Sequence, residues 1–311
     1  MRQHTLPPHQ LELKAALHDQ RHLMEKVQVP IVTLSATFRK ELADSYNLSV
    51  HPHADIVFSR AHYSMAEAVR QQALLAGHTA HLVDPTNFVS ESDWSKIEFT
   101  ETVGQAIARN RWLKWLKDKI DLVARNKLPL AQAIKSPLLY VTGSTTRPVI
   151  SLHYETGRIL AHAGKKVLQV ITDPHVRPQY VTFANHPNVS YAVFDKTTQD
   201  SFFTIAQDMG LDVADSRVTV TGPPIDPRVA RIRLRPKKIV TGQPINLGIT
   251  TGGLGTNLDE IKLVLEQFTP LLKSPEQIRL FLHAGTHTDF RNFFEDFAQE
   301  NSIRIGNLDD G

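Results

Sequence analysis

Short apolar runs alternate with longer amphipathic segments over most of the chain. Six runs have the length and composition of buried strands: 54–59, 81–84, 138–142, 167–172, 191–194 and 217–220. Between them, apolar residues recur at helical spacing in three segments: 65–76, 149–162 and 198–209. Because strands that alternate with helices build βαβ units, this pattern predicts an α/β domain with a parallel sheet.

The same alternation resumes after a stretch rich in Pro, Arg and Lys. An apolar run at 245–250 breaks into a glycine-rich turn, and a helical pattern then extends over 258–272. A strand at 278–283, a helix to about 299 and a strand at 302–305 follow. We predict a complete Rossmann-like domain over 51–225, a basic Pro-containing linker over 226–243, and the first half of a second Rossmann-like domain over 244–311. Residues 1–50 hold a polar helix at 9–27 and a Val/Ile-containing run at 28–34, and we leave them as an unassigned extension.

The amino-acid composition excludes several kinds of functional site. The chain has 311 residues and no cysteine, which excludes disulfides, thiolate zinc sites and Cys nucleophiles. A net charge of +3 is too small to indicate a nucleic-acid-binding protein, although it suits a surface that meets phosphates. The sequence shows neither an apolar signal segment nor a run of about 18 apolar residues that would span a membrane. We expect a cytoplasmic protein, and a peripheral position on the inner face of the membrane stays open.

The glycine-rich turn is a candidate phosphate site. Glycines let a ligand approach the backbone, and the free N–H groups at a helix start attract phosphate. The turn does not fit G-x-G-x-x-G, because Leu258 stands at the third glycine, and it lacks the Lys of a P-loop. An ordinary tight turn is the alternative. The donor-binding candidates are Thr251, Gly252, Gly253, Gly255, Asn257 and Gly285.

A second group of candidates lies where predicted strands of the first domain end. Ligands of parallel sheets bind at this edge. His62 follows the first predicted strand, and an imidazole that titrates near neutrality suits a base that takes the proton of a hydroxyl. Asp173 follows the strand at 167–172 and could orient His62 or a hydroxyl, although capping of a turn is an equal alternative. The acceptor-side candidates are Ser59, Tyr63, Ser64, Thr172 and His175.

A basic helix with two tryptophans is predicted at 109–120. Trp beside Lys and Arg is typical of helices that lie in a membrane interface. The membrane or lipid candidates are Trp112, Lys114, Trp115 and Lys117. A helix that buries its apolar stripe on its own sheet is the favoured alternative.

Four segments in order carry a family resemblance. They are Ser-Arg-Ala-His-Tyr-Ser-Met-Ala-Glu-Ala at 59–68, Val-Ile-Thr-Asp-Pro-His at 170–175, Val-Thr-Val-Thr-Gly-Pro-Pro-Ile-Asp at 218–226 and Gly-Gly-Leu-Gly-Thr-Asn at 252–257. The chain resembles GT-B glycosyltransferases, in the group of monogalactosyldiacylglycerol synthase and the N-acetylglucosaminyltransferase of peptidoglycan precursors. The family's first turn is glycine-rich, unlike the turn here. Its later donor-domain signature would lie beyond residue 311, so we expect a truncated chain with weak or no activity.

The resemblance implies a metal-independent, inverting transfer. A hexose or N-acetylhexosamine would pass from a nucleotide sugar, with UDP-sugars favoured, to a hydroxyl acceptor, lipids included. His62 would be the base, Asp173 would assist it, and the donor would be a substrate rather than a cofactor. No D-x-D or H-E-x-x-H motif indicates a metal. Two alternatives stay open: an enzyme like UDP-N-acetylglucosamine 2-epimerase, and a non-catalytic nucleotide-sugar or partner-binding protein, which Arg60-Ala61 in place of glycines favours.

Overall fold

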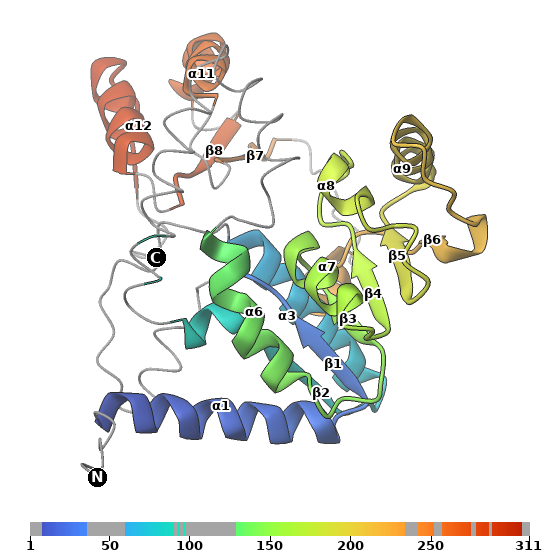
Figure 1. The fold of residues 1–311 in the computed structure, drawn as a ribbon. Coiled ribbons are helices and arrows are strands. Elements are labelled where there is room, and N and C mark those ends of the chain that lie inside the picture. The colour runs from blue at the N-terminus through green and yellow to red at the C-terminus, as the bar shows by residue number, and fades with distance from the viewer. Residues whose placement is uncertain are drawn as a thin grey trace. The chain divides into compact units, whose positions relative to one another are not determined.

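The chain folds into two compact units, Met1–Ile232 and Arg233–Gly311 (Figure 1). The computed structural model describes residues 8–35, 60–89, 93, 96, 129–233, 242–251, 257–274, 278–285 and 288–306. Each unit has its own parallel sheet and its own hydrophobic core. The predicted α/β class is therefore confirmed.

The first unit is built on a six-stranded parallel sheet of Rossmann-like type, with strand order β2-β1-β3-β4-β5-β6. The strands are β1 (Val29–Val32), β2 (Ala80–Val83), β3 (Val149–Ser151), β4 (Val167–Val170), β5 (Val189–Val193) and β6 (Val218–Val220). The chain runs outward from β1 to β2 on one side and returns to β3 on the other. The strand order therefore reverses between β1 and β3, and parallel sheets bind ligands at such a switch point.

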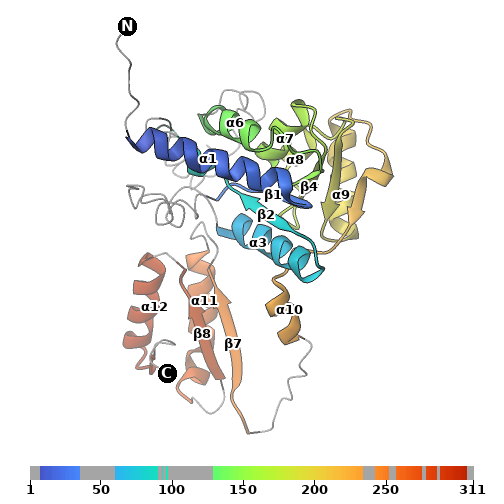
Figure 2. The ribbon, with the colours of Figure 1, turned by 90° about the horizontal axis from the view of Figure 1, so that it is seen from below.

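Helices cover both faces of this sheet. In the part of the chain that the structure describes, they are α1 (Pro8–Lys26), α3 (Arg60–Leu75), α6 (Pro129–Val141), α7 (Tyr154–His162), α8 (Pro178–Val181) and α9 (Lys196–Asp208), with short 3₁₀ helices η2 (Pro85–Phe88) and η4 (Asp215–Arg217). A further helix, α10 (Pro227–Arg233), follows β6 and is largely exposed. Figure 2 shows α3 on one side of the sheet and α1, α6 and α7 on the other. Two buried clusters match this division, since one contains residues of α3 and the other contains residues of α1, α6, α7 and α9.

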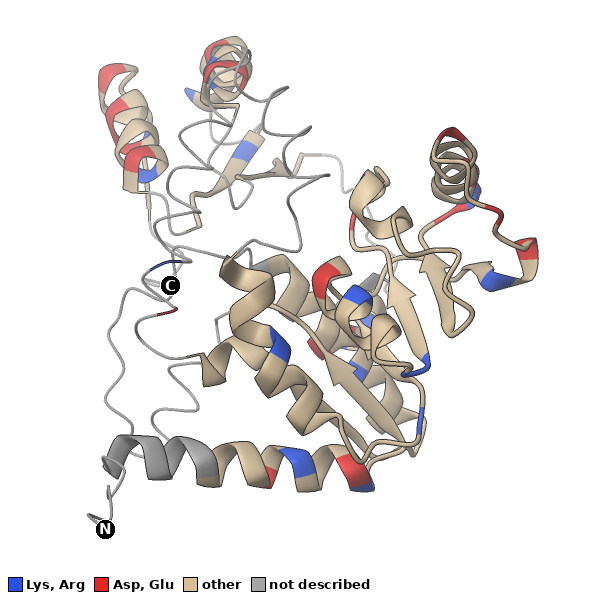
Figure 3. Ribbon diagram, viewed as in Figure 1, with Lys and Arg blue, Asp and Glu red and all other residues tan. Residues whose placement is uncertain are grey.

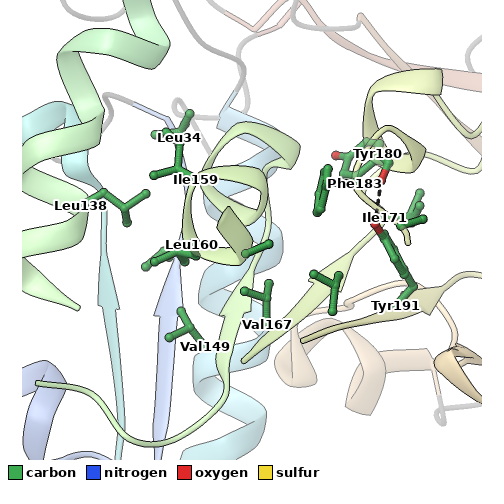
Figure 4. Packing of buried hydrophobic residues seen from close by; sticks show 14 of the residues in the cluster. Leu34, Leu138, Val149, Ile159, Leu160, Val167, Ile171, Tyr180, Phe183 and Tyr191 are labelled. Carbon is green, nitrogen blue, oxygen red and sulfur yellow. Dashed lines mark hydrogen bonds between the residues drawn. The ribbon is translucent and has the colours of Figure 1, made fainter. Parts of the chain in front are cut away.

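The larger cluster fixes α7 against the sheet (Figure 4). Leu160 of α7 is fully buried in the same cluster as Val149 and Val167, which begin β3 and β4. Farther along, the Tyr191 hydroxyl donates a hydrogen bond to the backbone oxygen of Tyr180 (2.9 Å). Burying side chains of this size stabilises the fold by about 1.5–3 kcal/mol each. The N-terminus of α7 is thereby held at the carboxyl end of β3.

β1 corrects the predicted domain boundary. The strand predicted at 54–59 lies outside the described residues. Instead, β1 comes from the segment left as an extension, and it pairs with both β2 and β3. Pro30 is tolerated there because the N–H groups of Val29 and Thr33 point to β2, so position 30 points its missing donor to the other side. Pairing with β3 begins only at Ile31, one residue later.

Two predicted elements of the first unit are wrong. The strand predicted at 138–142 is the end of α6, in which Ile134, Leu138 and Val141 recur at helical spacing and are all buried. The helix predicted at 149–162 begins with the strand β3, and α7 starts only at Tyr154. Both errors arise because a short continuous apolar run fits a buried strand and a buried helix equally well.

The second unit is smaller. Its strands β7 (Ile245–Thr250) and β8 (Ile278–His283) are parallel, and its helices are α11 (Leu258–Leu272) and α12 (Thr288–Glu300). Leu265, Phe290, Phe294 and Phe297 form its buried core. These elements were all predicted from the sequence.

The strand predicted at 302–305 is wrong, because α12 ends there in a capping turn. Ser302 adopts a left-handed φ of 56°, and the N–H of Ile303 donates to the Ala298 oxygen (2.8 Å). This bond satisfies a carbonyl of the last helical turn. The predicted linker at 226–243 is also partly helical, since α10 occupies its first residues.

Charged residues of both signs are mixed along α1, α9 and α12 (Figure 3). In the part of the chain that the structure describes, no helix combines the length and apolar character needed to cross a membrane. The membrane and lipid candidates Trp112, Lys114, Trp115 and Lys117 lie outside the described residues, so that interpretation stays a prediction.

Candidate functional site

Two histidines meet at the carboxyl edge of the first sheet. His62 lies in the first turn of α3, and His153 directly precedes α7. The two helices cover opposite faces of the sheet, and both begin at the edge where the strand order reverses. The imidazole centroids are 5.2 Å apart, with the rings inclined at 65° in an edge-to-face contact. A histidine pair therefore occupies the switch point.

The imidazole of His62 is surrounded by groups that set its protonation state. Burial lowers the pKa of His62, because the surrounding protein disfavours the charged imidazolium. The carboxylate of Asp173 acts on the pKa in the opposite direction, and the guanidinium of Arg177 lowers it further. The ring is therefore mainly neutral at pH 7.

Asp173 approaches His62 from the segment that follows β4. It forms an ion pair with Arg177, with 3.3 Å between the Asp173 Oδ2 and the Arg177 Nε. The Arg177 side chain is exposed and the Asp173 side chain is partly exposed, so this pair itself adds little stability. Its importance is local, since it places one negative and one positive group within electrostatic range of the imidazole. The fold thus brings together the two residues predicted as catalytic.

His153 is held by hydrogen bonds to both its ring and its backbone. Its Nδ1 accepts a hydrogen bond from the Glu155 N–H (3.1 Å), which caps the N-terminus of α7. Its backbone oxygen accepts from the Ser151 hydroxyl (2.9 Å), the Thr156 hydroxyl (2.8 Å) and the Gly157 N–H (3.1 Å). Only 5% of the residue is exposed. The fold therefore fixes both the backbone and the ring of His153.

A buried glutamine holds this network against the sheet. The Gln169 Nε2 donates to the backbone oxygens of Ser151 (3.0 Å) and Val170 (2.9 Å). A Cβ atom at Gly157 would lie only 1.9 Å from the Gln169 Oε1, so a side chain at position 157 is excluded in this arrangement. The absence of a side chain lets the first turn of α7 approach β4 closely.

Two tyrosine rings, Tyr154 and Tyr180, pack in sequence next to the His153 ring. The Tyr154 ring lies 4.2 Å from the His153 ring and 5.4 Å from the Tyr180 ring. Burial raises the pKa of Tyr180, so its hydroxyl stays protonated, and it pairs with the Thr172 hydroxyl (2.6 Å). Thr172 was predicted to face the acceptor, but only 3% of it is exposed and its hydroxyl contacts Tyr180. Thr172 therefore holds the Tyr180 ring in place and does not face the acceptor side.

The other acceptor-side candidates lie near this edge in different environments. Tyr63 is half-buried and Ser64 is exposed in the first turns of α3, while His175 is exposed after β4. Ser59 lies outside the described residues. His153 is not identified from the sequence, because the three-residue strand before it fits the helical pattern that follows. The available signal is the Val-Ile-Ser run that ends two residues before His153, since the residues after a strand end lie at the ligand edge.

The donor candidates that the structure describes lie at the carboxyl edge of the second sheet. Thr251 follows β7, and both its N–H (3.0 Å) and its hydroxyl (3.1 Å) donate to the His283 backbone oxygen at the end of β8. Gly285 has a left-handed φ of 60°, and Asn257 has a φ of 69° at the start of α11. The candidates Gly252, Gly253 and Gly255 lie outside the described residues.

Within the described ranges, no group of three or more His, Asp or Glu side chains is arranged to hold a metal ion. Comparisons of the chain with protein-family models, curated proteins and solved structures found no match. The basis for assigning a function is therefore the chemistry of the two sheet edges.

Proposed function

We propose that this chain is a glycosyltransferase of GT-B type. It would transfer a hexose or N-acetylhexosamine from a nucleotide sugar, with UDP-sugars favoured, to a hydroxyl acceptor without a metal. The observation that carries the proposal is His62, an imidazole held mainly neutral beside Asp173 at the switch point of a parallel sheet.

The reaction assigns a defined task to His62. As the acceptor oxygen bonds to the anomeric carbon of the sugar, the bond from that carbon to the diphosphate oxygen breaks. The diphosphate leaves with the bonding electrons, and the proton of the acceptor hydroxyl passes to His62. The carboxylate of Asp173 favours the resulting imidazolium, because it raises the affinity of His62 for a proton.

The second unit supports the donor side of the proposal. Its parallel strands β7 and β8 end next to one another, and α11 begins directly after the glycine-rich segment. The N–H groups at the start of a helix favour a diphosphate, whose charge grows as it leaves. Two units that each contain parallel strands and helices also agree with the two-domain organisation of GT-B enzymes.

The lipid part of the proposal rests on the sequence alone. Trp112 and Trp115 stand among Lys and Arg in the segment predicted as a basic helix. This composition favours a membrane surface and a lipid acceptor. Co-sedimentation with anionic lipid vesicles tests it, and a chain that stays in the supernatant would count against it.

The test is a sensitive assay of nucleotide release. The chain is incubated with radiolabelled UDP-sugars and a lipid extract, and His62→Gln is compared with His78→Gln. His78 is the matched control, because it is exposed at the far end of α3. We expect release that depends on the acceptor, falls about 100-fold in His62→Gln and is unchanged in His78→Gln.

The other outcomes separate the alternatives. Release that survives in His62→Gln would contradict the role of His62 as base. An epimerised sugar among the products would favour the epimerase-like alternative. No release from any donor by the folded chain would count against transfer and favour the binding-protein alternative.

A further inference from the structure

We propose that His153 is a positioning residue for His62. In this arrangement His153 is a neutral imidazole with its proton on Nε2, and it fixes the orientation of the His62 ring without taking up a proton itself. The role of His62 as the base rests on the function proposed above. The state and contacts of His153 follow from hydrogen bonds that the fold itself forms.

The tautomer of His153 follows from one hydrogen bond. The backbone N–H of Glu155 can only donate, so the Nδ1 that faces it at 3.1 Å must accept. A neutral imidazole carries its single proton on the other nitrogen, which is Nε2. The helix cap therefore selects one of the two neutral forms, as a fixed partner on one ring nitrogen does in general.

A second proton on His153 is opposed by three features. It would sit on Nδ1, where it would replace the bond from Glu155 with two N–H groups facing each other. It would place a positive charge at the N-terminus of α7, where the helix dipole is already positive. It would also place a charge on a residue of which only 5% is exposed to solvent. The carboxylate of Glu155 offers little compensation, because it is paired with Arg158.

His62 is then the member of the pair that takes up the proton. The charged or titratable groups around the pair come from several elements: Asp173 and Arg177 from the segment after β4, Glu155, Arg158 and Tyr154 from α7, Tyr180 from α8, and Tyr63 from α3 itself. Of these, Asp173 favours a positive charge on His62, whereas Arg177 disfavours it and the buried Tyr180 hydroxyl stays protonated and uncharged. Proton uptake is thus directed to the ring beside the carboxylate.

The position of the His153 ring does not depend on His62. Its backbone is extended at φ −140° and ψ 133°, and three donors hold its carbonyl oxygen. The Tyr154 ring packs against it at 4.2 Å. In contrast, His62 lies in a first helical turn, where its ring orientation depends on what it packs against. The edge-to-face contact at 5.2 Å is therefore a fixed surface for the catalytic ring.

The test compares His153→Asn with the wild type. Asn is a good N-cap, so the substitution keeps an acceptor for the Glu155 N–H and removes only the ring. His78→Asn is the control at an exposed histidine. The readout is NMR of ¹⁵N-histidine-labelled chain from pH 5 to 8, which reports the tautomer and the titration of each ring.

In the wild type we expect His153 in the Nε2–H form throughout, and His62 titrating with a midpoint below 6.5. In His153→Asn the midpoint of His62 should rise by about half a pH unit or more, because loss of the covering ring relieves its burial. His78→Asn should leave it unchanged. A His153 ring that titrates in this range, or that carries its proton on Nδ1, would overturn the proposal, and so would an unmoved His62 midpoint in His153→Asn.

Activity separates this inference from the proposed function. If nucleotide sugars are turned over, the acidic limb of the pH–rate profile should shift to higher pH in His153→Asn, together with the His62 midpoint. Turnover with an unmoved limb would refute the positioning role and keep the transferase. The expected NMR result without turnover of any nucleotide sugar would keep the positioning role and count against the transferase.

Discussion

The substitution Gly157→Ala is a direct test of how closely α7 approaches the sheet. The new Cβ would lie 1.9 Å from the Gln169 Oε1 and 3.3 Å from the Ser151 Oγ. Gln169 has little freedom to move away, because it is fully buried and its Nε2 donates to two backbone oxygens. The substitution must therefore overpack the contact between α7 and the sheet and break these hydrogen bonds.

The expected change in the free energy of unfolding is the sum of one stabilising and two destabilising effects. Ala favours a helix over Gly by about 1 kcal/mol, overpacking costs about 1–3 kcal/mol, and the two hydrogen bonds of Gln169 contribute about 2 kcal/mol together. The free energy of unfolding of the first unit should therefore fall by about 2–4 kcal/mol. For a unit of this size the melting temperature should fall by roughly 5–15 °C.

Urea and thermal unfolding followed by circular dichroism measure this change, with Gln169→Ala and the double variant as controls. Shortening Gln169 makes room for the new methyl group, so Gly157→Ala should be neutral or stabilising in that background. The coupling energy should be about 2–5 kcal/mol, which is the difference between the losses in the two backgrounds. Equal losses in both backgrounds, or a Gly157→Ala chain as stable as the wild type, would refute the close approach.

Three further predictions concern stability. Burial lowers the pKa of His81 to about 4, below its unfolded value near 6.5, so the folded chain binds fewer protons in between. Its contribution is therefore complete above pH 6.5 and is lost as the pH falls toward 4, and the loss of about 3 kcal/mol in urea titrations should shrink in His81→Gln. His153→Ala should cost about 1 kcal/mol of unfolding free energy through loss of the α7 cap, whereas His153→Asn should keep most of it; equal losses would mean that the cap contributes nothing. Tyr180→Phe should cost about 1–2 kcal/mol by leaving the buried Thr172 hydroxyl without its 2.6 Å partner, and adding Thr172→Val should recover part of this in the same assay.

The sequence predicts the fold well where strands and helices are long enough to show their own periodicity. The alternation from β4 to β6 and the order β7, α11, β8, α12 follow from apolar runs separated by amphipathic helices. β1 and β3 escape this reasoning, because only two residues separate β1 from the end of α1 and only two separate β3 from the start of α7. Each short strand therefore merges with the pattern of the adjoining helix, and only pairing in the sheet identifies it as a strand.

The candidate site divides along the same line. His62 and Asp173 can be located from the sequence, because each follows a recognisable apolar segment near the expected ligand edge. His153 cannot, since its position depends on whether residues 149–151 are a strand or the start of a helix. Its side-chain state is harder still, because it depends on a cap to Glu155 and on the buried contacts of Ser151 with Gln169. These contacts join residues from separate strands, and no local pattern encodes them.

The position of β1 in the middle of the sheet has a consequence for biosynthesis. Its register partners Ile31 and Ile150 are separated by about 120 residues, so during translation at about 5–20 residues per second β1 must wait roughly 6–24 s for β3 to be made. An unpaired apolar strand invites association with other nascent chains. Pro30 counters this during the delay, because it removes one donor from the side of β1 that faces away from β2. A proline inside a central strand thus protects the growing polypeptide until its proper neighbour has been synthesised.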